Sequence, residues 1–364
     1  MQAQIYDKNF ISKEAVIENE IEWYDVSPRL FDIYGFLASD ESILSRRLPS
    51  DIAEATSKGV LGHHAHAAGG RVRFSTDSPF IALKVVYESI SVPTVCTAIL
   101  CYGFDLNVLC DGGEEKFIAA FRPTAADAVV GTPVTYRKSV NAEGKTHCYT
   151  LNFPHFASVA SLKIGLAVGS SLGRGMAYKN SSPIVFYGSS ITHGAAAGKP
   201  GNTYENFISQ KYNLDYVNLG FSGNARAEDV IVDYMAGIDM CMFVSDYDHN
   251  APNVDHLNKT HFSMYEKIRA KNPTIPYIMI SRPDFYPNIE DSKRRREVVR
   301  ASYERAVALG DKNVYYIDGE HLFDGEFYES CTNDAVHPND IGFLRMADKI
   351  GAVIVNALYG EVDL

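Results

Sequence analysis

The hydrophobic periodicity of this chain changes near residue 180, and that change constrains the fold more than any other feature. Before it, large apolar side chains recur at every second position, which is the pattern of strands with one buried face. After it, short apolar runs alternate with stretches of helical periodicity. A chain of 364 residues has room for two domains. The two rhythms predict one domain over residues 1–180 and another over 181–364.

The first half is predicted to be an antiparallel β-sandwich resembling a jelly roll. Its period-two runs cover residues 71–76, 80–88, 104–110, 148–153 and 162–168. Asp111-Gly112-Gly113 fits a hairpin turn between two of them. Gly169-Ser170-Ser171-Leu172-Gly173 formally matches the Gly-x-Ser-x-Gly nucleophile elbow. The elbow requires a helix after the serine, and no helical pattern follows this segment. We therefore interpret it as a loop that connects the domains.

The second half is predicted to be a three-layer α/β/α domain with a parallel sheet. Its expected strands are 184–187, 216–219, 240–244, 277–280 and 314–317. Its expected helices lie near 203–213, 225–237, 256–271, 291–309 and 341–358. In such sheets, functional groups collect in the loops that follow the carboxyl ends of the strands.

Composition excludes several classes of protein. The net charge of −11 argues against general nucleic-acid binding, which needs a basic face. No apolar run approaches the roughly 20 residues of a membrane span. The six scattered cysteines are expected to be free thiols, and the first residues show no basic or apolar leader. We therefore expect a cytoplasmic protein, although the mature form of a secreted or periplasmic protein would look the same.

Four blocks of polar residues follow the expected strands. They are Gly188-Ser189-Ser190-Ile191-Thr192, Asn218-Leu219-Gly220-Phe221-Ser222-Gly223, the loop that contains Asn250, and Asp334-Ala335-Val336-His337. Serine hydrolases need an exposed serine, a histidine base, a carboxylate that orients the histidine, and donors for the oxyanion. Ser190, His337 and Asp334 can supply the first three, and a Gly223 N–H and the Asn250 amide can be the donors.

The ordered blocks resemble the SGNH (GDSL-like) hydrolase superfamily. By this resemblance Ser190 is the nucleophile, His337 the base and Asp334 its orienting carboxylate, while Ser190 N–H, Gly223 and Asn250 line the oxyanion hole. Ser189 stands where many members carry Asp, and Asp248-His249 replaces the usual Gly-x before Asn250.

The first half resembles the β-rich domain that precedes one bacterial branch of this superfamily. Gly103-Phe104-Asp105-Leu106 is similar to that branch's Gly-x-Asp-Leu-Tyr signature, with Asn107 in place of Tyr, and the segments 46–49 and 68–74 fit the same domain. This branch includes carbohydrate O-acetyl esterases. The resemblance therefore implies a serine esterase that removes short acyl groups, acetyl above all, from a small molecule or an oligosaccharide.

Two alternatives stay open. One is a non-catalytic carbohydrate-binding protein on the same scaffold, and the other a thioesterase or peptidoglycan deacetylase with the same site. No metal or organic cofactor is expected, and a homo-oligomer is possible. Arg282, His249 and His193 are candidate substrate contacts. His63, His64 and His66 are interpreted as a polar loop, which is also a candidate to shape the substrate pocket.

Overall fold

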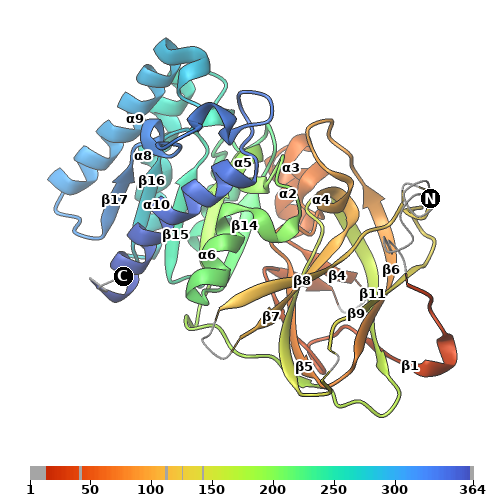
Figure 1. Ribbon diagram of the computed structural model, residues 1–364. Coiled ribbons are helices and arrows are strands. Elements are labelled where there is room, and N and C mark those ends of the chain that lie inside the picture. Colours follow the sequence, from red (N-terminus) through yellow and green to blue (C-terminus); the bar gives the residue numbers. More distant parts are fainter. Residues whose placement is uncertain (1–13, 41–42, 111–113, 125, 142, 361–364) are drawn as a thin grey trace.

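The computed structural model describes all residues except 1–13, 41–42, 111–113, 125, 142 and 361–364. Figure 1 shows a β-rich part, made from the first half of the chain, beside a part in which helices flank one parallel sheet. This arrangement confirms the predicted fold class. The predicted hairpin turn at 111–113 lies outside the described residues.

Two antiparallel sheets form the β-rich part. Their strands are β1 (Ile21–Asp25), β2 (Asp32–Tyr34), β5 (Arg71–Thr76), β6 (Phe80–Ile90), β7 (Phe104–Leu109), β8 (Glu115–Phe121), β9 (Val134–Ser139), β10 (His147–Asn152), β11 (Ala157–Ala167) and β12 (Gly173–Arg174). One sheet has the order β1-β11-β6-β9, and the other the order β12-β5-β10-β7-β8, with β2 paired to β5. Alternate side chains of both sheets, such as Phe74 and Ile164, meet in one core, which explains the period-two pattern.

Short elements connect these strands. They are η1 (Glu18–Glu20), the hairpin of β3 (Ala38–Asp40) and β4 (Ile43–Arg46), and the helices α2 (Ser50–Thr56), α3 (Lys58–His63) and α4 (Ala98–Tyr102). Ala53 of α2 and Val60 of α3 are buried in the same core as Ile231 of the second half. Part of the first half therefore packs into the core of the second half. The domain boundary at residue 180 stays a prediction.

The second half is built on five parallel strands. They are β13 (Ile184–Gly188), β14 (Tyr216–Gly220), β15 (Met242–Asp246), β16 (Tyr277–Ile280) and β17 (Val314–Ile317), in the order β14-β13-β15-β16-β17. The helices are α5 (Ser190–His193), α6 (Tyr204–Tyr212), α7 (Asp229–Ala236), α8 (Val254–Lys271), α9 (Ile289–Ala308) and α10 (Asp340–Tyr359). Short 3-10 turns are η2 (Pro200–Asn202), η3 (Asp248–Asn250), η4 (Tyr286–Asn288), η5 (Gly319–His321) and η6 (Tyr328–Cys331).

Each face of the parallel sheet has its own core. Ile184 and Phe186 of β13 belong to the core that contains α6 and α10 and continues into the sandwich. Val185 and Tyr187 belong to the core that contains α7, α8 and α9. These helices therefore flank the sheet as predicted (Figure 1).

Two predicted elements of the second half begin two or more residues later in the structure than predicted. The third strand begins at Met242 rather than at residue 240, because its pairing with β13 starts at Met242, opposite Ile184. The helix expected from residue 225 begins at Asp229. Ala227 has a φ of 53°, a left-handed conformation that a right-handed helix does not contain.

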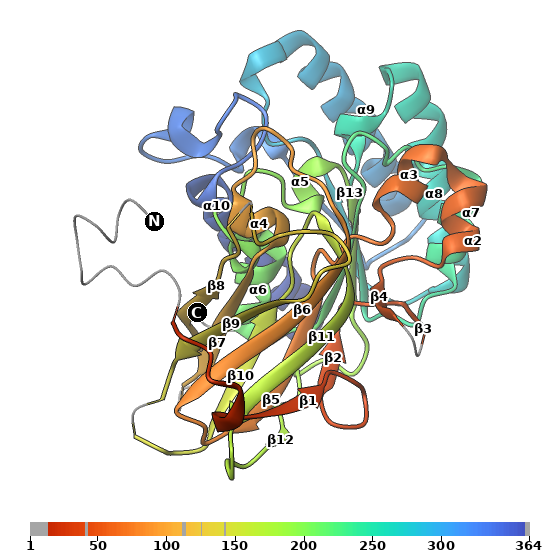
Figure 2. The same ribbon diagram turned by 90° about the vertical axis from the view of Figure 1, so that its right-hand side faces the viewer.

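The carboxylate of Asp105, in the segment similar to Gly-x-Asp-Leu-Tyr, forms hydrogen bonds between the two parts. Asp105 is fully buried, and its oxygens accept hydrogen bonds from the Gly201 N–H (2.8 Å) and Lys199 Nζ (3.1 Å). Arg71 makes a second tie through Asp215, at 2.5 Å. Figure 2 shows α2 of the first half lying beside α7 of the second. In the described part of the chain, no helix combines the length and hydrophobicity that a bilayer span requires.

Candidate active site

Ser190 lies at a sharp turn from strand to helix. β13 ends at Gly188, and the Ser189 hydroxyl caps α5 by accepting the Ile191 N–H at 3.1 Å. A side chain at Gly188 would overlap Thr192, because a Cβ there would lie 2.0 Å from the Thr192 hydroxyl. The missing side chain thus lets α5 start directly on the end of the strand. As the first residue of α5, half-buried Ser190 is presented at the carboxyl edge of the sheet.

His337 and Asp334 complete a chain of hydrogen bonds to Ser190. The Ser190 Oγ lies 2.9 Å from His337 Nε2, and His337 Nδ1 lies 2.8 Å from the Asp334 carboxylate. Since a carboxylate only accepts, Nδ1 carries the proton and Nε2 is the acceptor that faces the serine. The structure brings together the three residues that the sequence predicted, and one short turn carries both Asp334 and His337.

The environment of Asp334 keeps its carboxylate ionised. Burial alone would raise its pKa, but the His337 N–H at 2.7 Å and the His337 imidazole outweigh it and hold the pKa below the ordinary 3.8. The Val336 N–H also donates to this carboxylate, at 3.1 Å. Ala335 has a φ of 66°, and this left-handed residue closes the turn that brings carboxylate and imidazole together.

Three donors of the predicted oxyanion hole have no competing partner among the described residues: the Ser190 N–H, the Gly223 N–H and Asn250 Nδ2. The Asn250 Oδ1 accepts the Ala225 N–H at 3.2 Å, so the amide is held with its NH2 group free to donate. Gly223 has a φ of 72°, and a Cβ there would meet no atom within 4 Å. The three follow the adjacent strands β13, β14 and β15, where the order of the sheet reverses.

Hydrogen bonds from Arg282 and Arg295 hold the loop that carries Asn250. The buried Asp248 carboxylate accepts the Arg282 N–H at 3.1 Å, and burial raises the pKa of Asp248. Arg295 of α9 donates to the Asp248 carbonyl at 2.5 Å and to the Ala251 carbonyl at 3.0 Å. These bonds hold the loop in place, with Asp248-His249 where the family usually has Gly-x.

The three predicted substrate contacts have protein partners. The Arg282 guanidinium is buried, with Ser292 Oγ at 2.7 Å and Asp291 at 3.2 Å. His249 is half-buried, and its Nε2 is bonded to Asp284. His193 is fully buried. Contact with a substrate stays a prediction for each of them, and the buried positions of Arg282 and His193 do not favour it.

The predicted polar histidine loop is largely interior. His64 and His66 are buried, while His63 is half-buried. The rings of His63 and His66 lie 5.5 and 5.4 Å from the ring of His193, centroid to centroid. Burial lowers the pKa of His63 to about 4 and that of His66 to about 2, so both are neutral at ordinary pH. Access of this loop to substrate stays a prediction.

Sequence reasoning missed Arg47 and His155 of the first half. Arg47 is fully buried, and its guanidinium donates to the carbonyls of Asn218 (3.1 Å) and Gly220 (2.8 Å), at the end of β14. Arg47 lay in a segment that resembled the family, but nothing in it indicated a partner in the second half. His155 lay in no motif at all.

A possible cation group lies elsewhere. Among the described residues, Asp318, Glu320 and His321 are close enough together to share an ion. Arg296 is bonded to Glu320 and lies 3.6 Å from Asp318, so a guanidinium already balances these carboxylates. The prediction that no metal serves the Ser190 site stays a prediction.

A hydroxyl, an imidazole and a carboxylate joined in this order are the arrangement that serine hydrolases use. Comparison with known families agrees. The model of the GDSL-like lipase/acylhydrolase family matches residues 181–355, and the model of the N-terminus of SGNH-hydrolase-type esterases matches residues 21–172. The chain belongs to this GDSL-like, SGNH-type hydrolase family.

Solved structures share the arrangement of both halves. A Bacteroides ovatus protein described as a GDSL-like lipase by sequence is 26% identical, with a TM-score of 0.80 over 93% of this chain and 98% of that one. The salicylyl-acyltransferase SsfX3 from a tetracycline biosynthetic pathway is 18% identical, with a TM-score of 0.74 over 94% and 100%. An acetyl xylan esterase from the rumen bacterium Butyrivibrio proteoclasticus is 12% identical, with a TM-score of 0.57 over 93% and 98%. A search of curated proteins gave no match.

Proposed function

We propose that this protein is a serine esterase that hydrolyses short acyl esters, acetyl esters of a carbohydrate in particular. The observation that carries the proposal is the continuous hydrogen-bond chain from the Ser190 hydroxyl through His337 to Asp334. Membership of the hydrolase family supports the reaction type. The acetyl xylan esterase among the proteins of this fold supports the substrate class.

The reaction runs through an acyl-enzyme. The Ser190 oxygen attacks the acyl carbonyl carbon while its proton passes to His337 Nε2. The negative oxygen of the tetrahedral intermediate accepts hydrogen bonds from the Ser190 N–H, the Gly223 N–H and Asn250 Nδ2. The bond to the alcohol then breaks, and His337 returns the proton to the departing oxygen.

Water completes the cycle. His337 takes a proton from water as the water oxygen attacks the acyl carbon, and the bond to Ser190 breaks with return of that proton to the serine. Asp334 stays ionised and stabilises the imidazolium that forms twice in the cycle. The residues named here complete this cycle without a redox step, which fits the expectation of no cofactor.

A pair of serine variants tests the proposal. Ser190→Ala is expected to abolish the release of acetate from acetylated oligosaccharides and from p-nitrophenyl acetate, because no nucleophile remains. Ser171→Ala is the matched control, since Ser171 is exposed and is the serine of the competing Gly-x-Ser-x-Gly match. Retained activity in Ser190→Ala, or lost activity in Ser171→Ala, would overturn the assignment.

The acyl group has its own test. A series of p-nitrophenyl esters from acetate to decanoate is expected to give kcat/KM values that fall with chain length. A rise towards decanoate would reject a short-acyl esterase. Glycan binding without hydrolysis, and without labelling by a serine-reactive probe, would instead favour the non-catalytic carbohydrate-binding alternative.

A further inference from the structure

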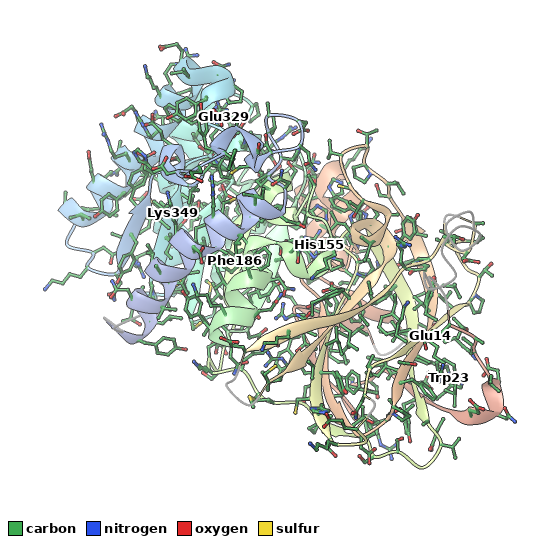
Figure 3. The ribbon with its side chains drawn as sticks, viewed as in Figure 1. Glu14, Trp23, His155, Phe186, Glu329 and Lys349 are labelled. Carbon is green, nitrogen blue, oxygen red and sulfur yellow. The ribbon has the colours of Figure 1, made fainter. Side chains whose placement is uncertain are left out.

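His155 and His193 form a reciprocal pair of hydrogen bonds between the two halves of the chain. His155 lies between β10 and β11 of the β-rich part, and His193 is the last residue of α5. The His155 Nδ1 donates to the His193 carbonyl at 2.8 Å, and the His193 Nε2 donates to the His155 carbonyl at 2.8 Å. Figure 3 shows His155 where the two parts meet.

The other ring nitrogen of His193, Nδ1, adds a hydrogen bond to the loop that carries Gly223. His193 Nε2 carries the ring proton and donates a hydrogen bond to the His155 carbonyl. Nδ1 of the neutral ring is therefore an acceptor. It lies 2.9 Å from the Ser222 hydroxyl, which therefore donates to it. Ser222 directly precedes Gly223. One imidazole thus connects the β-rich half, the helix of Ser190 and the loop of the Gly223 donor.

Burial keeps the imidazoles in the required state. The side chain of His193 is fully buried and stacks on Phe156, with ring centroids 4.4 Å apart. Burial lowers the pKa of His193 well below 6.5 and that of His155 to about 4. Both rings therefore stay neutral at working pH. Both ring nitrogens of His193 are therefore hydrogen-bonded within the protein.

Two glycines make the contact tight. A Cβ at Gly194 would lie 2.5 Å from His155 Nδ1, and Gly194 has a φ of 91°. A Cβ at Gly220 would lie 2.1 Å from the His193 backbone nitrogen. The backbone of α5 is thus held between His155 on one side and the end of β14 on the other, with no space for even one additional methyl group.

We propose that His193, held by His155, is a positioning residue that fixes the Ser190 helix relative to the Gly223 loop. The β-rich half is then part of the catalytic apparatus, since it supplies one side of this connection. The inference rests on the proposed function, because it assigns Ser190 and Gly223 their roles. Small displacements of a nucleophile from its oxyanion donors cost large factors in rate, so the effect should fall on kcat.

A matched pair of variants at residue 155 tests the connection. In His155→Asn, the amide nitrogen takes the place of Nδ1 and keeps the donor to the His193 carbonyl. In His155→Leu, a side chain of similar size lacks that donor. We expect His155→Leu to lower kcat for p-nitrophenyl acetate roughly 10- to 100-fold with KM changed less than about twofold, and His155→Asn to stay within about threefold of wild type.

Ser222→Ala tests the other end of the connection with little risk to folding, because Ser222 is only half-buried. It is expected to lower kcat about three- to tenfold, also with KM unchanged. Equal kcat in the Leu and Asn variants, or an effect confined to KM or to the amount of folded protein, would overturn the positioning role.

Hydrogen exchange separates this inference from the proposed function. The amides of peptides that cover 188–196 should exchange faster in His155→Leu than in wild type or His155→Asn, whatever the activity of the protein. Unchanged exchange in His155→Leu would overturn the inference even in an active esterase. If the wild-type protein lacked Ser190-dependent hydrolysis, faster exchange in His155→Leu than in wild type would support the connection and reject the esterase function.

Discussion

Asn250 offers the sharpest test of how the site stabilises negative charge. Its Oδ1 accepts the Ala225 N–H at 3.2 Å, which leaves Nδ2 as a donor for the oxyanion. Asn250→Ala removes that donor. The loss of one such donor is worth about 2.7–4 kcal/mol of transition-state stabilisation. We therefore expect kcat for p-nitrophenyl acetate to fall roughly 100- to 1000-fold, with KM nearly unchanged.

The same substitution has a structural cost that must be measured separately. Ala225 is buried, so its N–H loses a partner in Asn250→Ala, at about 1–3 kcal/mol of folding free energy. Asn250→Asp is the matched variant, because it keeps an oxygen for the Ala225 N–H but presents a second oxygen where the donor was. It should be as stable as wild type in urea unfolding, and at least as slow as the alanine variant.

Two results would refute this reasoning. If Asn250→Ala kept kcat within about threefold of wild type, Asn250 would not be a donor to the transition state. If Asn250→Asp were fully active, the orientation of the amide inferred from the Ala225 bond would be wrong.

Three further predictions concern buried or paired carboxylates. Asp334→Asn is expected to lower kcat on the order of 1000- to 10000-fold, because the amide no longer keeps the proton of His337 on Nδ1. Steady-state kinetics on folded protein checks this. A loss below about tenfold would contradict it. Burial raises the pKa of Glu205 from 4.5 to about 8, so its contribution to stability is full below about pH 4.5 and is lost as the pH rises through 8. Glu205→Gln should therefore flatten the stability profile between pH 5 and 9 in urea unfolding, and an unchanged profile would reject the buried-acid assignment. Asp105→Asn should destabilise the fold by about 1–3 kcal/mol, since Lys199 and the Gly201 N–H lose a charged acceptor; equal unfolding midpoints would show that this tie is dispensable.

The parts of the site that the sequence predicted are those set by local chain order. Ser190 follows a strand directly, and Asp334 and His337 share one turn, so their relative positions depend on a few neighbouring residues. The apolar rhythm likewise predicted the five parallel strands, because strands buried on both faces are continuous apolar runs. The predicted start of the helix at residue 225 was wrong, because the left-handed conformation of Ala227 delays the helix to Asp229.

The parts that the sequence did not predict depend on contacts between distant segments. His193 follows the nucleophile closely and was interpreted as a candidate substrate contact, but its ring turns inward to His155, 38 positions earlier. Arg47 reaches Gly220, 173 positions later in the chain. No periodicity or spacing reports such pairs, because they lie where the sandwich and the parallel sheet pack together.

Covalent labelling of Ser190 tests the central claim most directly. The protein is treated with a fluorophosphonate, its intact mass is measured, and the labelled peptide is identified. We predict one equivalent of label on Ser190, unchanged stoichiometry in Ser171→Ala and none in Ser190→Ala. Failure to label, or label on another serine, would contradict the account of Ser190 as a nucleophile activated by His337.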